Sequence, residues 1–129
     1  MNVDGDDDGG FTLVELLVVV VIVGILIAIA VPLYAQYRHG AENSSAKADV
    51  RAAVVAAAAC TDGAGGAVPA TATETGSLVT FAGCTEVVRL SDGDSLVYTK
   101  SSAHTYLVSV TNSDSGSTYT YDSTVGRIG

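Results

Sequence analysis

One acidic side chain lies inside an otherwise apolar stretch near the start of the chain. Glu15 is the only charged residue between Gly10 and Tyr37, and fifteen of the residues from Leu13 to Val31 are Leu, Ile or Val. A carboxylate in such surroundings needs a cationic partner, unless it lies at the membrane interface and reaches back to water. No Lys or Arg precedes Arg38, so the apolar stretch holds no side-chain partner for Glu15. An amino terminus created nearby could supply the cation.

Other residues that could do chemistry are few. His39 and His104 are the only histidines, and neither has sequence neighbours that suggest a catalytic triad or a metal site. Four aspartates fall in or near predicted turns without the spacing of an EF-hand, and we expect them to be solvated: Asp92, Asp94, Asp114 and Asp122. The sequence therefore predicts no enzyme, no metal site and no cofactor.

The apolar stretch has the length of a membrane-spanning helix, which needs about 20 apolar residues. On an insertion scale its Leu, Ile and Val residues contribute roughly −5 to −9 kcal/mol, against a cost of about 3 kcal/mol for one acidic residue at mid-membrane. Insertion is therefore favoured although Glu15 enters with the segment. In lipid the backbone must satisfy its own hydrogen bonds, and a single helix does so.

The start of the chain closely resembles the type IV pilins and their pseudopilin relatives. The resemblance lies in Gly10-Phe11-Thr12-Leu13-Val14-Glu15, followed by an apolar helix that contains Gly24, Pro32, Tyr34 and Tyr37. It implies that a prepilin peptidase cuts after Gly10 and methylates the new terminal residue, Phe11. It also implies that Glu15 of an incoming subunit pairs with the Phe11 amine of a neighbour, and that the helix between Gly24 and Pro32 can lose helicity on packing.

The resemblance further implies partners and a location. The partners are other copies of the chain, the peptidase, and an assembly platform with its ATPase. The precursor is stored in the inner membrane with its C-terminal domain outside the cytoplasm, and it moves to a cell-surface pilus. The leader, residues 1–10, departs from the family because it has four Asp and no base. Arg38 alone is a weak signal for the opposite orientation.

The rest of the chain predicts an α+β fold in which a long N-terminal helix packs on a small antiparallel meander. We expect a membrane and polymerisation half at 11–32, an amphipathic half at 33–60, a loop at 61–77 and a sheet at 78–129. One helical stripe should face the sheet, and a second set of small residues should lie on another side. The first stripe is Val50, Ala53, Val54, Ala57 and Cys60, and the second set is Ala48, Ala52, Val55 and Ala59. Five strands are predicted, at 78–81, 85–90, 95–100, 105–111 and 118–124.

Cys60 and Cys84 are the only cysteines and lie on either side of the predicted loop. In a small extracytoplasmic domain a disulfide is the favoured state of such a pair, and it would contribute roughly 3.5 kcal/mol by loop-closure entropy. We therefore predict that a disulfide joins the end of the helix to the sheet.

Charge and composition limit the possible classes of function. The formal net charge is −8, and the few bases are scattered, so nothing predicts binding of nucleic acid. We expect a structural subunit of a type IV pilus-like filament. Two alternatives stay open: a pseudopilin of a type II secretion or DNA-uptake machine, and a single-pass membrane protein that displays a small binding module.

Overall fold

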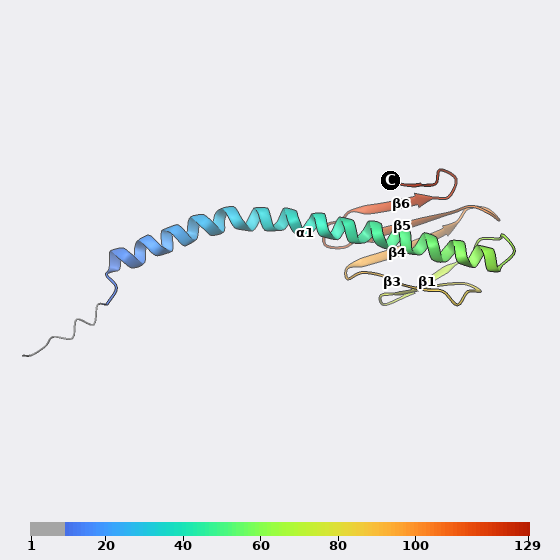
Figure 1. The fold of residues 1–129 in the computed structure, drawn as a ribbon, viewed down its shortest axis with the longest axis horizontal. Coiled ribbons are helices and arrows are strands. Elements are labelled where there is room, and N and C mark those ends of the chain that lie inside the picture. Colours follow the sequence, from blue (N-terminus) through green and yellow to red (C-terminus); the bar gives the residue numbers. More distant parts are fainter. Residues whose placement is uncertain (1–9) are drawn as a thin grey trace, which may run out of the picture. The chain divides into compact units, whose positions relative to one another are not determined.

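The computed structural model describes residues 10–129, and the leader prediction for residues 1–9 lies outside this range. One helix, α1 (Leu13–Gly63), is followed by seven strands. The chain divides into two compact units at Tyr37 and Arg38, and α1 contributes to both (Figure 1). The first unit is the apolar part of α1. The second unit, Arg38–Gly129, holds the rest of α1 and all the strands.

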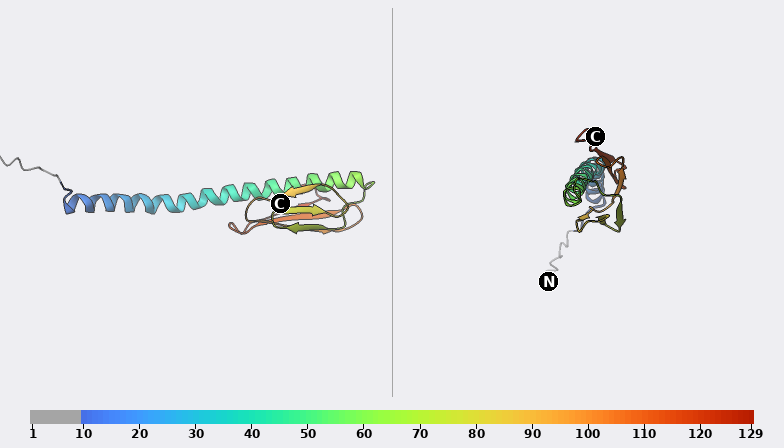
Figure 2. Two further views of the ribbon diagram at one scale, coloured as in Figure 1. Left: turned by 90° about the horizontal axis from the view of Figure 1, so that it is seen from below. Right: turned by 90° about the vertical axis from the view of Figure 1, so that its right-hand side faces the viewer.

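The seven strands form two antiparallel sheets. The first sheet contains β1 (Ala72–Thr75), β2 (Leu78–Phe81) and β3 (Val87–Arg89) in that order. The second contains β4 (Asp94–Lys100), β5 (Tyr106–Asn112), β6 (Thr118–Asp122) and β7 (Arg127–Ile128), also in chain order. Within the second unit, the strands lie along one side of its helical part (Figure 2). The predicted α+β class is confirmed, and the meander is divided between two sheets.

The core of the second unit lies between the helix and the inner face of the strands. Alternation in β5 places Tyr106, Val108 and Val110 inside, as the sequence pattern predicts. The helical stripe that faces them is buried at Val50, Ala53, Ala57 and Cys60, whereas Val54 is only partly buried. The buried apolar residues that complete the core are Ala46, Ala56, Val68, Val79, Phe81, Val88, Leu90 and Leu96.

Aromatic side chains link the two sheets. The ring of Tyr98 in β4 lies 5.4 Å from that of Phe81 in β2 and 5.5 Å from that of Tyr106 in β5. The Tyr98 hydroxyl donates a hydrogen bond of 2.9 Å to the carbonyl of Pro69. Burial, together with the neighbouring Tyr106, raises the pKa of Tyr98 to about 12. Tyr98 therefore stays neutral at physiological pH and acts as a packing residue with one polar contact.

A polar contact also joins the sheets at their edges. Glu74 in β1 accepts a hydrogen bond of 2.7 Å from the backbone N–H of Leu96 in β4. This contact depends on a strand that the sequence did not predict, because β1 lies inside the segment 61–77 that was expected to be a loop. Strand β7 was missed as well. The five predicted strands all occur, and their ends differ from prediction by up to two residues.

Candidate membrane and assembly segment

The helix begins immediately after a reciprocal hydrogen-bonded cap. The Thr12 N–H donates to Glu15 Oε2, and the Glu15 N–H donates to Thr12 Oγ1, both at 3.2 Å. The first helical bond follows, from the Leu16 N–H to the Thr12 carbonyl. This is a capping box, in which two backbone donors that a helix start leaves unpaired are satisfied by side chains. The pair therefore fixes the start of α1 and the position of the Glu15 carboxylate.

Thr12 was not singled out from the sequence as a functional residue. The signal was present, since Thr followed three residues later by Glu before an apolar run is the pattern of a capping box. The charge of Glu15 bears on membrane insertion, whereas its spacing from Thr12 predicts the local hydrogen bonds.

The predicted cleavage position lies outside the helix. Gly10, Phe11 and Thr12 precede α1, and Phe11 is 87% exposed. A peptide bond that is neither helical nor buried is accessible to a protease. The structure therefore places the Gly10–Phe11 bond in accessible backbone, one residue before the cap.

The apolar part of α1 has no protein partner within the subunit. Every residue from Gly10 to Gly40 is exposed, including the long run of Leu, Ile and Val. An 18-residue window of α1 has a mean hydropathy of 3.3 and no buried residue, so the helix is long and apolar enough to cross a membrane. An apolar surface this large is typical of a segment that contacts a membrane or another protein.

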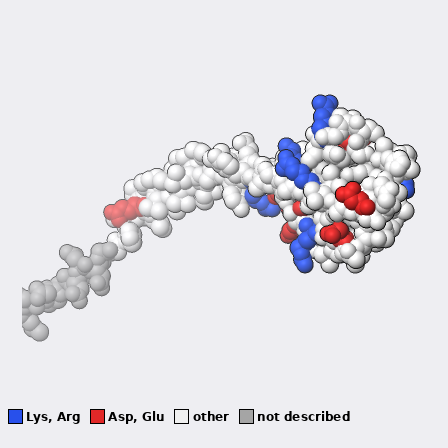
Figure 3. All heavy atoms as spheres, turned by 45° about the vertical axis from the view of Figure 1, so that its right-hand side comes forward, with Lys and Arg blue, Asp and Glu red and all other residues white. Residues whose placement is uncertain are grey.

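Glu15 also lacks a cationic partner. Within residues 10–129 no Lys, Arg or His lies within salt-bridge distance of its carboxylate. Figure 3 shows acidic atoms near the start of the apolar segment and none of the blue basic atoms along it. Neutralisation of Glu15 in an apolar environment therefore requires either a proton or a cation other than the Lys, Arg and His side chains that the structure describes.

Comparisons with known proteins agree with this geometry. Residues 7–31 match the family model described as the prokaryotic N-terminal methylation motif. A stretch of 43 residues is 46% identical to the type IV major pilin protein PilA of Myxococcus xanthus, covering 33% of this chain and 20% of that protein. The start of the chain is therefore similar to that of a type IV pilin and carries the N-terminal methylation motif. The match spans about a fifth of the relative's length, and no solved structure matches the chain.

Two positions in the pilin-like helix were predicted to weaken it. Gly24 and Pro32 both lie within α1, which continues without interruption past Pro32. Pro32 has no N–H to donate along the helix, and Gly24 is a poor helix former. A Cβ built at Gly24 meets nothing within 4 Å. Neither residue is therefore required by packing inside the subunit, and their role in flexibility stays a prediction.

A stripe of small residues on the second half of α1 is exposed. Ala48, Ala52 and Ala59 face solvent, and Val55 is 69% exposed. Shallow grooves flank this stripe on both sides, one bordered by β3 and the other by β7. The burial of the opposite stripe agrees with the sequence pattern, and the exposed small residues permit close approach by another helix.

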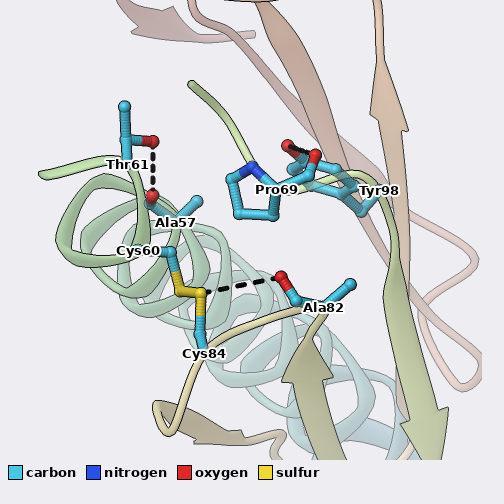
Figure 4. The surroundings of a disulfide bond; sticks show 7 residues. All are labelled: Ala57, Cys60, Thr61, Pro69, Ala82, Cys84 and Tyr98. Atoms are coloured by element: carbon cyan, nitrogen blue, oxygen red, sulfur yellow. Dashed lines mark hydrogen bonds between the residues drawn. A yellow bond between two sulfur atoms is a disulfide. The ribbon is translucent and has the colours of Figure 1, made fainter. Parts of the chain in front are cut away.

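The disulfide predicted from the sequence is present. Cys60, in the last turns of α1, is bonded to Cys84, which follows β2, and the Cα atoms are 5.6 Å apart (Figure 4). Cys84 Sγ also lies 3.8 Å from the carbonyl of Ala82, and because a disulfide sulfur carries no proton we take this as a van der Waals contact. The bridge closes the segment that contains β1 and β2.

The remaining candidates do not form a catalytic or metal-binding cluster. His39 Nδ1 lies 3.3 Å from Glu42, whereas His104 Nδ1 contacts the carbonyl of Gly66 at 2.8 Å. Within residues 10–129 no group of three or more His, Cys, Asp or Glu side chains is arranged to hold a metal ion.

The predicted turn aspartates have different environments. Asp122 is partly exposed, and hydrogen bonds from the Thr124 hydroxyl and N–H, at 2.6 and 2.8 Å, lower the pKa of its carboxyl. For Asp94 the prediction of a solvated carboxylate is wrong, because this side chain is 8% exposed and lies at the start of β4. The residues before Asp94 form a turn, and a turn predicts a side chain exposed to solvent. The strand instead begins at Asp94, and its side chain is directed inward.

Proposed function

We propose that this pilin-like chain is the precursor of a subunit of a type IV pilus-like surface filament. The observation that carries the proposal is the arrangement at the start of α1. An accessible Gly10–Phe11 bond precedes a capped helix whose one acidic residue, Glu15, has no cation within the described subunit. A protease that cuts this bond creates an amine close to the carboxylate.

The proposed assembly step is a change of surroundings for the apolar helix. Before assembly its exposed Leu, Ile and Val side chains are covered by lipid, with the second unit outside the cytoplasm. In the filament they are covered by the helices of neighbouring subunits. Lipid tails and Leu side chains are similarly apolar, so the hydrophobic effect differs little between the two states. The orientation of each subunit and its register against its neighbours must therefore be set by helix packing and by polar contacts.

The Glu15 carboxylate supplies the specific polar contact in this proposal. After cleavage the Phe11 amine, methylated by the peptidase, is the nearest cation that the chain offers. Pairing of Glu15 with the Phe11 amine of a neighbouring subunit neutralises two charges that would otherwise lie separately in an apolar environment. A subunit in the wrong register would leave the carboxylate and the neighbour's amine unpaired. The free-energy cost of these unpaired charges favours the correct register.

The partners follow from these steps. They are the prepilin peptidase, other copies of the chain, membrane lipid before assembly, and an assembly platform with its ATPase. The Cys60–Cys84 disulfide supports an extracytoplasmic position for the second unit, because such bonds persist in oxidising compartments. Bound nucleic acid, metal or cofactor has no place in the proposal.

Mass spectrometry of the mature N-terminus tests the proposal. We expect a chain that begins at N-methylated Phe11. A mature chain that still begins at Met1 would support a single-pass membrane protein that displays a binding module. Long fibres built mainly of this chain would favour a pilin over a pseudopilin of a secretion or DNA-uptake machine.

A further inference from the structure

Two carboxyl groups from different elements meet in the core of the second unit. Asp49 lies on the buried side of α1 and is 6% exposed, and Asp94 at the start of β4 is 8% exposed. Both are joined to Ser91, whose N–H donates to Asp49 Oδ2 at 2.6 Å and whose carbonyl accepts from the Asp94 N–H at 3.1 Å. Two ionised carboxylates in contact inside a protein repel each other and lose their hydration, so at least one charge must be neutralised.

Both carboxyl oxygens of Asp49 accept hydrogen bonds from one residue, Ser91. Its Oδ2 accepts a hydrogen bond of 2.6 Å from the Ser91 N–H, and its Oδ1 accepts one of 3.2 Å from the Ser91 hydroxyl. Both oxygens therefore act as acceptors toward the loop before β4. A protonated Asp49 would have to give up part of this acceptor capacity.

The contacts of Asp94 leave one oxygen without a donor. Asp94 Oδ1 accepts a hydrogen bond of 2.6 Å from Asn112 Nδ2. The orientation of the Asn112 amide is fixed, because its Oδ1 accepts from the N–H groups of Asp114 and Ser115 at 3.0 and 2.9 Å. Asp94 Oδ2 is buried and has no hydrogen-bond partner among residues 10–129. A proton on Oδ2 would turn this unpaired acceptor into a donor toward Asp49.

The turn before Asp94 holds the carboxyl in this position. Gly93 has a φ of 79°, a conformation that residues with a Cβ rarely adopt. A Cβ at Gly93 would also lie 3.2 Å from Ser113 Oγ, so the backbone approaches the end of β5 closely. Asp94 pairs with Asn112 in the strand register at this point. Backbone geometry therefore directs the Asp94 side chain toward the helix.

No base neutralises the carboxyl pair within the part of the chain that the structure describes. Arg38 is engaged with Glu42 at 3.1 Å and with Asp114 at 3.5 Å. Lys47 lies over the ring of Tyr119, 4.7 Å from its centroid. The pair can therefore be neutralised by a proton or by a bound cation. A proton is favoured, because the two carboxylates are not part of any group of three or more His, Cys, Asp or Glu side chains that could hold a metal ion among the described residues.

We propose that Asp49 and Asp94 share one proton, carried on Asp94 Oδ2 and donated to Asp49, and that this proton-binding site holds helix α1 to strand β4. The groups that face Asp94 are Asp49 and Ser45 of α1 and Asn112 of β5, of which Asp49 is the only titratable one. The site is independent of filament assembly, because it lies wholly within the second unit.

The direction of the pKa of Asp94 agrees with this arrangement. Burial raises the pKa of Asp94, and the neighbouring Asp49 raises it further, against the lowering effects of Asn112 and of the Ser45 hydroxyl. A group whose folded pKa lies above its unfolded value stabilises the folded state fully below the unfolded pKa, here near 4. This stabilisation is lost as the pH rises through the folded pKa of Asp94.

The experiment measures unfolding of the full chain in detergent micelles by urea, from pH 4.5 to 8, with near-ultraviolet circular dichroism of the packed tyrosines as the readout. For the natural chain we expect the unfolding equilibrium constant to rise by up to tenfold per pH unit until the folded pKa of Asp94 is passed, as release of one proton requires. Asp94→Asn should remove this rise. Its amide reproduces the protonated carboxyl, since the oxygen accepts from Asn112 and the nitrogen donates to Asp49.

Asp92→Asn is the matched control, because Asp92 is exposed in the same turn and its replacement should leave the pH dependence unchanged. Taking the difference between the natural chain and Asp94→Asn also cancels the contribution of every titratable group that the two chains share. An infrared band of a protonated carboxylic acid, present above pH 5 in the natural chain and absent in Asp94→Asn, would report the proton directly.

Two outcomes would overturn the proposal. The first is that Asp94→Asn is less stable than the natural chain at pH 8, which would mean that an ionised Asp94 is required. The second is that added Ca²⁺ stabilises the natural chain over a chelated sample, and that Asp94→Asn loses this effect. A cation would then occupy the site in place of the proton.

Discussion

Removal of the disulfide should destabilise the second unit by an amount that follows from its position in the chain. Cys60 and Cys84 are 24 residues apart, and the entropy lost on closing a loop of this size raises the free energy of the unfolded chain by about 3.5 kcal/mol at 25 °C. A unit of 92 residues has a total stability of about 5 to 14 kcal/mol. The bridge therefore accounts for a large fraction of the stability of the second unit.

The test is urea unfolding of a Cys60→Ala, Cys84→Ala double variant beside the natural chain, both in detergent micelles. With a dependence of about 1.5 kcal/mol per M urea, the midpoint should fall by about 2 M. Alanine suits position 60, which lies in a helix on the buried stripe. Reduction of the natural chain with dithiothreitol should reproduce the shift, and the same treatment should leave the double variant unchanged.

A midpoint shift below about 0.5 M would refute this reasoning. It would mean that the unfolded chain already holds the two segments together, or that the folded state loses little when the cross-link is absent. A large shift in the double variant without a matching shift on reduction would instead assign the loss to packing of the sulfur atoms.

Three further predictions concern the core, the pH response and assembly. Val108→Ala, at a fully buried site, should lower the free energy of unfolding by about 2 kcal/mol in urea titrations. Val97→Ala, on the exposed face of the neighbouring strand, should change it by less than about 0.5 kcal/mol. Equal effects of the two substitutions would contradict the assigned core. The pKa of Asp122 is lowered in the folded state, so the ionised carboxylate stabilises the fold above the unfolded pKa near 4, and this stabilisation is lost as the pH falls through the folded pKa. Acid titration should therefore destabilise the natural chain more than Asp122→Asn. Parallel acid titration curves for the two chains would argue against this prediction. Gly24→Ala combined with Pro32→Ala should leave folding intact and reduce fibre formation seen by electron microscopy, since neither position is packed inside the subunit; normal fibres would remove the flexibility argument.

The helix and its faces could be predicted from the sequence because they depend on local periodicity. The apolar run and the stripe that contains Val50, Ala53 and Ala57 follow the helical repeat, and the structure buries that stripe. The alternation in β5 was equally informative, since one face is buried and the other is not. The pairing of Cys60 with Cys84 followed because the chain has two cysteines and a plausible oxidising location.

The short strands could not be predicted because their stabilisation comes from their neighbours. Strand β1 has the sequence ATET, in which no residue is strongly apolar, and it exists through pairing with β2 and through the bond from Leu96 to Glu74. Strand β7 is two residues long and pairs with β6. Neither segment carries a pattern that differs from that of a loop.

The buried carboxyl pair shows the same limit for a site. Asp49 lies next to Val50 on the helix, and a periodicity argument that counts apolar residues passes over it. Asp94 follows a Ser-Asp-Gly turn, which in sequence indicates solvent. Their contact depends on the crossing of α1 and β4, a long-range feature that the local pattern does not contain. The capping box of Thr12 and Glu15, in contrast, depends on residues close together in the chain, and the sequence pattern alone predicts it.

Fibre formation by a Glu15→Gln variant tests the central claim most directly. Gln at this position can preserve the capping box with Thr12, because its side-chain oxygen still accepts the backbone N–H, but it removes the charge. Cells that make this variant should process the precursor at Gly10–Phe11 as before and should form few or no fibres, measured by sheared-fibre yield against the natural chain. Normal yields of fibre from fully processed Glu15→Gln would show that assembly does not require pairing between this carboxylate and the amine of a neighbouring subunit, and would contradict the account.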